Sequence, residues 1–108
     1  MANEKIRASH ILIMHNESKD SRSEISKEKA KKSIDVIYKS VVEGKTTFGD
    51  AAVRQSDCSS AEQGGNLGEF GKGMMVKPFE DVAFSLKVDE ISKPFESEFG
   101  FHIVNREK

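Results

Sequence analysis

Apolar residues occupy both sets of alternate positions near the start of the chain, from residue 6 to residue 14 (IRASHILIM). Successive side chains of an extended segment point to opposite faces, so this segment would be apolar on both faces. Strands of this kind are usually central in a sheet that is covered on both sides. We therefore expect a central strand here, with His10 in its middle. A lone histidine in such a place is more often a packed core residue than a catalytic one.

A polar stretch over residues 15–26 (HNESKDSRSEIS) separates that strand from the first helical pattern. Its serine-rich, charged composition is typical of an exposed loop. Apolar residues then recur every three or four positions over residues 27–43, with Ser26 placed as N-cap and Gly44 just beyond the end. This pattern predicts an amphipathic helix.

A second, shorter helix is predicted from Phe48 to about Ser56, because the T-x-x-D sequence at its start resembles a capping box. Asp57 or Ser59 would then cap a short helical turn. Cys58 lies between them, where the positive end of a helix dipole lowers the pKa of a thiol. The alternative is a buried structural thiol, since free cysteine is often buried.

Five glycines fall within the ten residues 64–73, so the backbone there can turn sharply and approach another segment closely. Pro78 follows, in a position suited to the first turn of a further helix. Two β-prone segments, residues 91–97 and residues 99–106, are joined by a tight polar turn and predict a terminal hairpin. The second of them carries a histidine, His102, among apolar neighbours.

The expected order of elements is therefore strand, three helices, strand, helix and two strands. A few strands with helices packed across them make an α+β or mixed α/β domain. A chain of 108 residues is long enough for one core and too short for two, so we expect residues 1–108 to form a single domain.

Composition and charge argue against several classes of partner. The formal net charge of −1 and the pI near 6.3 give no bulk electrostatic reason to bind nucleic acid or a membrane surface. No apolar run approaches the roughly 20 residues that span a bilayer, and the charged N-terminus lacks the apolar centre of a secretion signal. A single cysteine, Cys58, rules out an internal disulfide and suits a reducing compartment, so we expect cytoplasm or nucleus.

The side chains that could carry chemistry are few: His10, Asp57, Cys58 and His102, with Ser97 as an additional hydroxyl. A cysteine nucleophile would need a histidine base and an oxyanion hole, and no family-specific sequence around the cysteine supports one. A zinc site would need three or four ligands at a motif spacing, which these residues lack. The glycines do not follow a buried strand as nucleotide-binding loops do. Each class is weakly supported, and neither a metal nor a cofactor is expected.

A reaction that needs no nucleophile fits these residues better. Rotation about the peptide bond before proline has a barrier of ~18–20 kcal/mol, because the amide loses its resonance in the twisted state. An enzyme lowers this barrier when it grips the proline ring in an apolar pocket and favours the twisted amide. Leu67, Met75 and Phe79, with two histidines and a cysteine around them, have the right side chains for such a pocket.

Four sequence motifs resemble those of the parvulin-type peptidyl-prolyl cis/trans isomerases. They are SHIL around His10, DCSS at residues 57–60, GGNLGEFGKGMM leading into VKPFEDVAFSL, and FGFHIV around His102. They cover nearly the whole chain, in the family's order. The resemblance implies an α+β fold in which helices surround a four-stranded antiparallel sheet, in the order β-α-α-α-β-α-β-β with four helices in all. It also implies a cofactor-free isomerase that acts on proline-containing segments of client proteins.

The same resemblance assigns roles to the polar candidates. His10 and His102 resemble the family's paired histidines, which hydrogen-bond side by side beneath the substrate and do not have to titrate. Cys58 resembles the residue that faces the prolyl carbonyl. Other members carry aspartate there, so covalent attack is not implied as the general mechanism. Ser97 stands close to the histidines, where the family often has threonine.

The proline pocket is implied at Leu67, Met75 and Phe79, with Met74 as the alternative if the register differs by one residue. Phe99 occupies a position that is small and polar in some relatives. The resemblance therefore implies a substrate-binding rim that is more apolar here than in those relatives.

The loop after the first strand departs from the pattern of the phosphorylation-directed members, which bind phosphate through basic residues that include paired arginines. This loop offers Lys19 and Arg22 as phosphate-binding candidates, without an adjacent arginine pair and with acidic neighbours. Met14 lies near a place where those relatives carry lysine. We therefore expect at most a modest preference for acidic or phosphorylated residues before proline.

Two further expectations follow from the resemblance. No WW module precedes the domain, and the chain is expected to be a monomer. The alternative function, from another class, is a proline-directed peptide-binding module that uses the same groove with little turnover.

Overall fold

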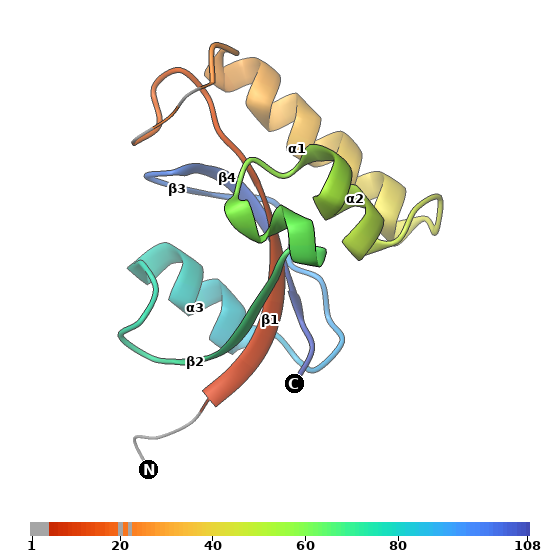
Figure 1. Ribbon diagram of the computed structural model, residues 1–108, viewed down its shortest axis with the longest axis vertical. Coiled ribbons are helices and arrows are strands. Elements are labelled where there is room, and N and C mark those ends of the chain that lie inside the picture. The colour runs from red at the N-terminus through yellow and green to blue at the C-terminus, as the bar shows by residue number, and fades with distance from the viewer. Residues whose placement is uncertain (1–4, 20, 22) are drawn as a thin grey trace.

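One antiparallel sheet runs through the protein (Figure 1). The computed structural model describes residues 5–19, 21 and 23–108. The strands of the sheet lie in the order β2-β1-β4-β3, so β1 and β4 are the inner pair. The strands are β1 (Lys5–Ile13), β2 (Asn66–Gly71), β3 (Phe95–Ser97) and β4 (Gly100–Arg106). The central position predicted for the first strand is confirmed.

Helices cover both faces of this sheet, as the two-sided apolar pattern of β1 requires (Figure 1). They are α1 (Lys27–Val42), α2 (Phe48–Gln55), a 3₁₀ helix (Ser59–Gln63) and α3 (Lys77–Ser85). The order predicted for the α+β fold is confirmed, with the difference that its third helical segment is a 3₁₀ helix. None of the helices in the described part of the chain has the length and apolar character needed to cross a membrane.

Each face of the sheet has its own hydrophobic core. Helices α1 and α2 pack on one face against side chains from β1 and β4, including Ile11 and Ile103. Helix α3 packs on the opposite face, where Phe79 and Ala83 meet Ile6 of β1. Burying such side chains is the main favourable term in folding.

The starts predicted for α1 and α2 are confirmed by their caps. The hydroxyl oxygen of Ser26 accepts a hydrogen bond from the backbone N–H of Lys29 at 3.2 Å. The hydroxyl oxygen of Thr47 likewise accepts from the N–H of Asp50 at 3.1 Å. Each bond satisfies an N–H that has no partner within the helix.

The cap predicted for the 3₁₀ helix is wrong. Neither Asp57 nor Ser59 caps it; Cys58 holds the N-cap position, without a side-chain cap bond. The carboxylate of Asp57 instead accepts from the N–H of Met14 at 2.8 Å, just past the end of β1. The aspartate therefore ties this turn to the central strand.

The strand predicted over residues 91–97 is present in two pieces: Ile91 forms an isolated antiparallel bridge with Asn105, and β3 begins at Phe95. Pro94 has no N–H to donate to a ladder. Ser92 makes one backbone and one side-chain hydrogen bond to Val104. Its N–H donates to the carbonyl of Val104 at 2.8 Å, and its hydroxyl accepts from the N–H of Val104 at 3.0 Å.

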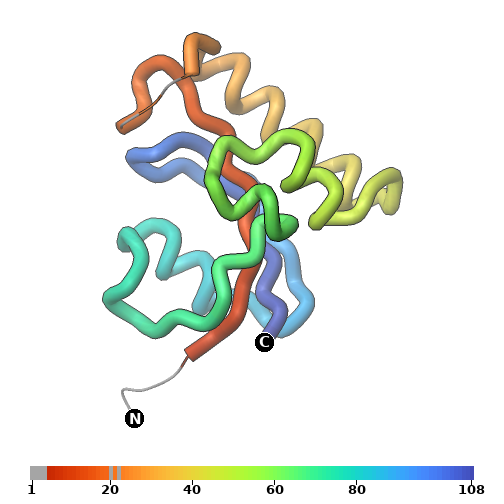
Figure 2. The backbone as a smooth tube through the Cα atoms, in the orientation of Figure 1, coloured from red at the N-terminus to blue at the C-terminus, as the bar shows by residue number. Residues whose placement is uncertain are grey.

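The loop after β1 lies beside the turn that joins β3 to β4, although the two are far apart in the sequence (Figure 2). The N–H of Lys19 donates to the carbonyl of Glu98 at 2.7 Å across this contact. The loop is therefore attached to the tip of the terminal hairpin.

Candidate active site

A cavity of about 370 Å³ lies on the α3 face of the sheet and gathers side chains from the whole length of the chain. β1, β4 and the start of the 3₁₀ helix supply polar groups to it; β2, α3 and two turns supply apolar ones. Its lining residues are His10, Cys58, Leu67, Met74, Met75, Val76, Phe79, Phe99 and His102. Two of the residues predicted from the sequence do not line the cavity: Ser97, which contacts Nε2 of His102, and Lys19, which contacts the ring of Phe99. Arg22 lies outside the described residues.

Two buried histidines form the polar floor of this cavity. The Nδ1 atoms of His10 and His102 are 3.4 Å apart, and the rings stack with their planes 24° apart. On the other side of His102, Nε2 lies 2.6 Å from the hydroxyl oxygen of Ser97. This hydroxyl also accepts from the N–H of Phe99 at 3.2 Å. A continuous hydrogen-bonded chain therefore links the serine to both imidazoles.

Burial, and to a lesser degree the electrostatic effect of the neighbouring His10, together lower the pKa of His102 to about 3. His102 is therefore neutral near pH 7 and has one N–H. If its Nε2 donates to Ser97, its Nδ1 must accept from His10; if Ser97 donates, the direction of the second bond reverses.

Cys58 has an unusually acidic thiol. A hydrogen bond with His10 is the main reason that its pKa falls to about 6, and contacts with Ser60 add to the effect while burial opposes it. Because Nδ1 of His10 faces His102, its Nε2 remains for the thiol. This nitrogen is buried and has no partner at full hydrogen-bond geometry, so the contact is a loose one. The helix dipole expected from the sequence is not the leading cause.

Aromatic rings fix the positions of the histidines. Phe79, which is 3% exposed, places its ring edge-on to both imidazoles, at 5.5 Å from His10 and 5.6 Å from His102. Phe95 stacks on His102 at 5.2 Å with its plane 14° away. Such contacts add to the energy of burial itself. The histidine rings therefore have little freedom to turn.

Two residues of this site receive no role from the sequence. Phe95 falls within a predicted strand, yet it pairs directly with His102 in the β3–β4 ladder; the register of the hairpin is the signal that predicts this contact. Val76 lines the cavity from the N-cap position of α3. Met74 and Met75 both line it, so the choice between them was unnecessary.

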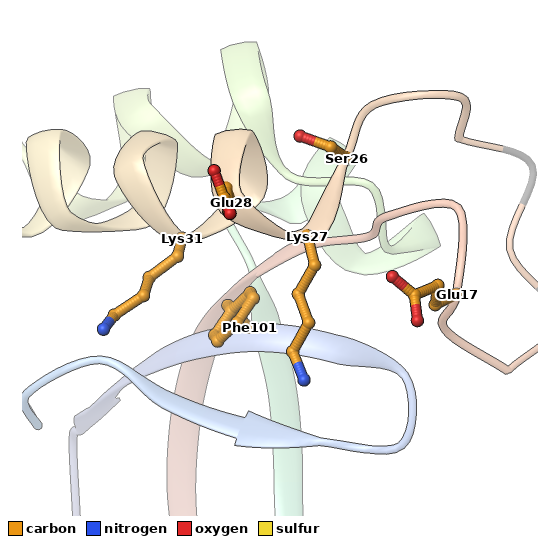
Figure 3. Close-up of a pocket in the computed structure, with 6 residues that line it drawn as sticks. All are labelled: Glu17, Ser26, Lys27, Glu28, Lys31 and Phe101. Atoms are coloured by element: carbon orange, nitrogen blue, oxygen red, sulfur yellow. The ribbon is translucent and has the colours of Figure 1, made fainter.

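A larger cavity, of about 550 Å³, lies on the opposite face of the sheet (Figure 3). Lys27 and Lys31 extend from α1 on either side of Phe101, and Glu17 approaches from the loop after β1. Its charged side chains are of both signs, whereas His10, His102 and Cys58 line the smaller cavity. The smaller cavity is therefore the better candidate for a catalytic site.

The charged surroundings of the smaller cavity are sparse. The ammonium group of Lys19 lies 5.8 Å from the ring centre of Phe99 and 3.3 Å from a carboxylate oxygen of Glu98. None of the nine lining residues is a lysine, arginine, aspartate or glutamate. Within the described part of the chain, no group of three or more His, Cys, Asp or Glu side chains is arranged to hold a metal ion.

The sequence matches the family described as Rotamase: PPIC-type PPIASE domain over residues 10–108. Peptidyl-prolyl cis-trans isomerase pin1 of Schizosaccharomyces pombe is 47% identical over 108 residues, which cover 94% of this chain and 62% of that protein. Peptidyl-prolyl cis-trans isomerase Pin1 of Arabidopsis thaliana is 42% identical over 113 residues, with 95% of each chain covered.

A solved structure, that of peptidyl-prolyl isomerase ESS1 from Candida albicans, has the same fold. It matches with a TM-score of 0.92 at 34% identity, over 100% of this chain and 66% of that one. The chain thus spans about two thirds of two of these relatives and nearly all of the third. The family match covers the cavity and all its lining residues. The chain therefore belongs to the PPIC-type PPIase family and is a parvulin-type peptidyl-prolyl cis/trans isomerase domain.

Proposed function

We propose that the 370 Å³ cavity is the active site and that residues 1–108 act as one unit to catalyse rotation about X-Pro bonds in peptides and proteins. The observation that carries this proposal is the position of the paired histidines and the acidic thiol at one wall of an otherwise apolar cavity. Apolar pockets with a few convergent polar groups are the usual form of small-ligand sites.

The apolar wall grips the proline ring. Leu67, Met75 and Phe79 provide soft and aromatic surface, and Phe99 closes the rim. Binding of the ring by itself stabilises the planar and the twisted amide equally, and does not accelerate the reaction. Catalysis requires groups that prefer the twisted state.

Cys58 supplies such a preference through its charge. Its pKa of about 6 makes it largely a thiolate at pH 7. The carbonyl oxygen of a planar amide carries partial negative charge from resonance, and loses part of it when the bond is twisted. A thiolate beside this oxygen therefore repels the planar state more than the twisted one. Each tenfold gain in rate requires about 1.4 kcal/mol of such a difference.

The histidines have a structural and electrostatic role in this proposal. His102 is neutral, and it holds His10 in the position from which His10 contacts Cys58. Ser97 in turn fixes the orientation of His102. None of these residues has to transfer a proton to the substrate during the reaction.

Substrates are proline-containing segments of client proteins, with at most a modest preference for acidic or phosphorylated residues before proline. Lys19 is the described cation at the rim, and Glu98 offsets its charge. We propose Arg22 as a second phosphate contact on the basis of the sequence alone. The unpaired thiol supports a reducing compartment, cytoplasm or nucleus. We propose a monomer that binds neither nucleic acid nor membranes, given the net charge of −1.

Exchange NMR on Ala-Leu-Pro-Phe, Ala-Glu-Pro-Phe and Ala-pSer-Pro-Phe peptides tests both the activity and the preference. We expect accelerated cis/trans exchange on all three, and rates for the two acidic peptides no more than about tenfold above that for the neutral one. The rival function, a binding module, predicts shifted peptide resonances without faster exchange. A preference of several hundredfold for the phosphopeptide would show that the loop reads phosphate strictly.

A further inference from the structure

The cation at the rim of the catalytic cavity is already paired within the protein. A carboxylate oxygen of Glu98 lies 3.3 Å from Nζ of Lys19, and Nζ also lies over the ring of Phe99. Both side chains are about half exposed, at 57% for the lysine and 50% for the glutamate. A substrate passing over Phe99 therefore meets an ion pair at this point.

The position of this ion pair affects how an acidic residue before proline can bind. A peptide whose proline ring lies among Leu67, Met75 and Phe79, and which leaves the cavity past Phe99, passes the β3–β4 turn. The lining residues include no lysine or arginine, and Nζ of Lys19 lies 5.8 Å from the ring centre of Phe99, so an acidic side chain on a peptide that passes Phe99 meets Lys19. It must compete there with Glu98.

We propose that Glu98 is a specificity-determining residue, an internal competitor that occupies Lys19 and limits the preference of the enzyme for acidic residues before proline. This inference rests on the proposed function of the cavity. It attributes the weak preference for acidic residues before proline to Glu98, which pairs with Lys19, as well as to the small number of basic residues in the loop.

The backbone keeps the competitor in place. The N–H of Lys19 donates to the carbonyl of Glu98 at 2.7 Å, so both side chains start from adjoining backbone positions (Figure 2). A free carboxylate must find the lysine from solution, whereas the glutamate is always close to it. The backbone bond does not use the side chain, so Glu98→Gln frees the ammonium group and leaves the loop attached to the hairpin.

The same hairpin offers a matched control. Glu96 lies two residues earlier and is 43% exposed, and its carboxylate pairs with Nζ of Lys27 at 3.1 Å. Lys27 belongs to the cavity on the opposite face of the sheet (Figure 3). Glu96→Gln therefore removes the same charge and a similar ion pair without exposing a cation to the catalytic cavity.

The test compares Ala-Glu-Pro-Phe with its neutral twin Ala-Gln-Pro-Phe, using kcat/KM from exchange NMR and Kd from titration. We compare the kcat/KM of the Glu-Pro peptide with that of the Gln-Pro peptide and call their quotient the Glu/Gln ratio. We expect Glu98→Gln to raise this ratio about two- to fivefold, or about 0.4–1 kcal/mol, the range of exposed ion pairs. Glu96→Gln should leave the ratio unchanged. In a Lys19→Met background, Glu98→Gln should have no effect on it. The gain should also shrink in 1 M salt, where the Debye length is about 3 Å.

Two results would overturn the inference: a ratio unaffected by Glu98→Gln, or an equal rise in both glutamate variants, which would indicate an effect of net charge only. Failure of the proposed function has a different signature, because Ala-Gln-Pro-Phe would then bind without faster exchange. The Kd ratios still decide the role of Glu98 in that case.

Discussion

His10 and His102 are diagonal neighbours on the two inner strands of the sheet. In the β1–β4 ladder, His10 stands opposite Val104, and His102 stands opposite Leu12. The two imidazoles therefore lie on the same face, one pleat apart, where long side chains can meet. Their Nδ1 atoms approach to 3.4 Å as a result of this register.

The contact between His10 and Cys58 should be visible in the reactivity of the thiol. Because only the thiolate is alkylated, the iodoacetamide rate should rise with pH around a midpoint near 6, the pKa set mainly by His10. In His10→Gln the midpoint should move up toward the ordinary value for cysteine. An unchanged midpoint in this variant would show that another group lowers the pKa.

The charge at position 58 should matter more than its nucleophilicity. Cys58→Asp places a carboxylate in the same position, and we expect its kcat/KM to remain within about tenfold of the wild type, a change of about 1.4 kcal/mol. Cys58→Ala removes the charge and should lose more activity. Loss of all activity in the aspartate variant would instead indicate a covalent mechanism.

The buried neutral state of His102 should make the protein sensitive to acid. Its pKa falls from the ordinary 6.5 to about 3 on folding, so the unfolded chain binds the extra proton between these values. The associated stability is present above pH 6.5 and is lost as the pH falls toward 3. Urea unfolding should show a loss of about 2 kcal/mol from this group between pH 7 and pH 5. In His102→Asn, the pH dependence should decrease by that amount.

Gly65 holds the 3₁₀ helix against the backbone of His10. Its φ is +85°, its carbonyl accepts from the N–H of His10 at 2.9 Å, and a Cβ here would overlap the carbonyl oxygen of His10. Gly65→Ala should therefore lower the free energy of unfolding by more than about 3 kcal/mol. Gly68 also has a positive φ, +72°, with open space around it. Gly68→Ala should cost only about 1 kcal/mol, the strain of the left-handed backbone. Thermal or urea unfolding of both variants separates crowding from strain.

Much of the fold could be predicted because its signals are local. The two-sided apolar pattern of the first strand, the caps at Ser26 and Thr47 and the proline at position 78 each specify an element from neighbouring residues. The strand predicted over residues 91–97 is interrupted between Ile91 and Phe95, because Pro94 has no N–H to donate and the hydroxyl of Ser92 takes the place of a backbone acceptor for Val104.

The geometry of the site depends on distant residues and was less accessible. His10 and His102 are 92 positions apart, and no spacing rule predicts that their rings meet. The family motifs identified these residues, but neither the loose contact of His10 with Cys58 nor the pairing of Lys19 with Glu98 follows from composition. Both depend on the way the chain folds back on itself.

The inner position of β1 and β4 also determines which parts of the cavity are rigid. Amide protons of inner strands exchange with solvent most slowly, because they open only with the whole domain. The imidazoles are therefore carried by the most stable part of the fold, whereas Met74 is 67% exposed and can change its side-chain conformation. Rigid polar groups and adaptable apolar surface thus lie in different parts of one small cavity.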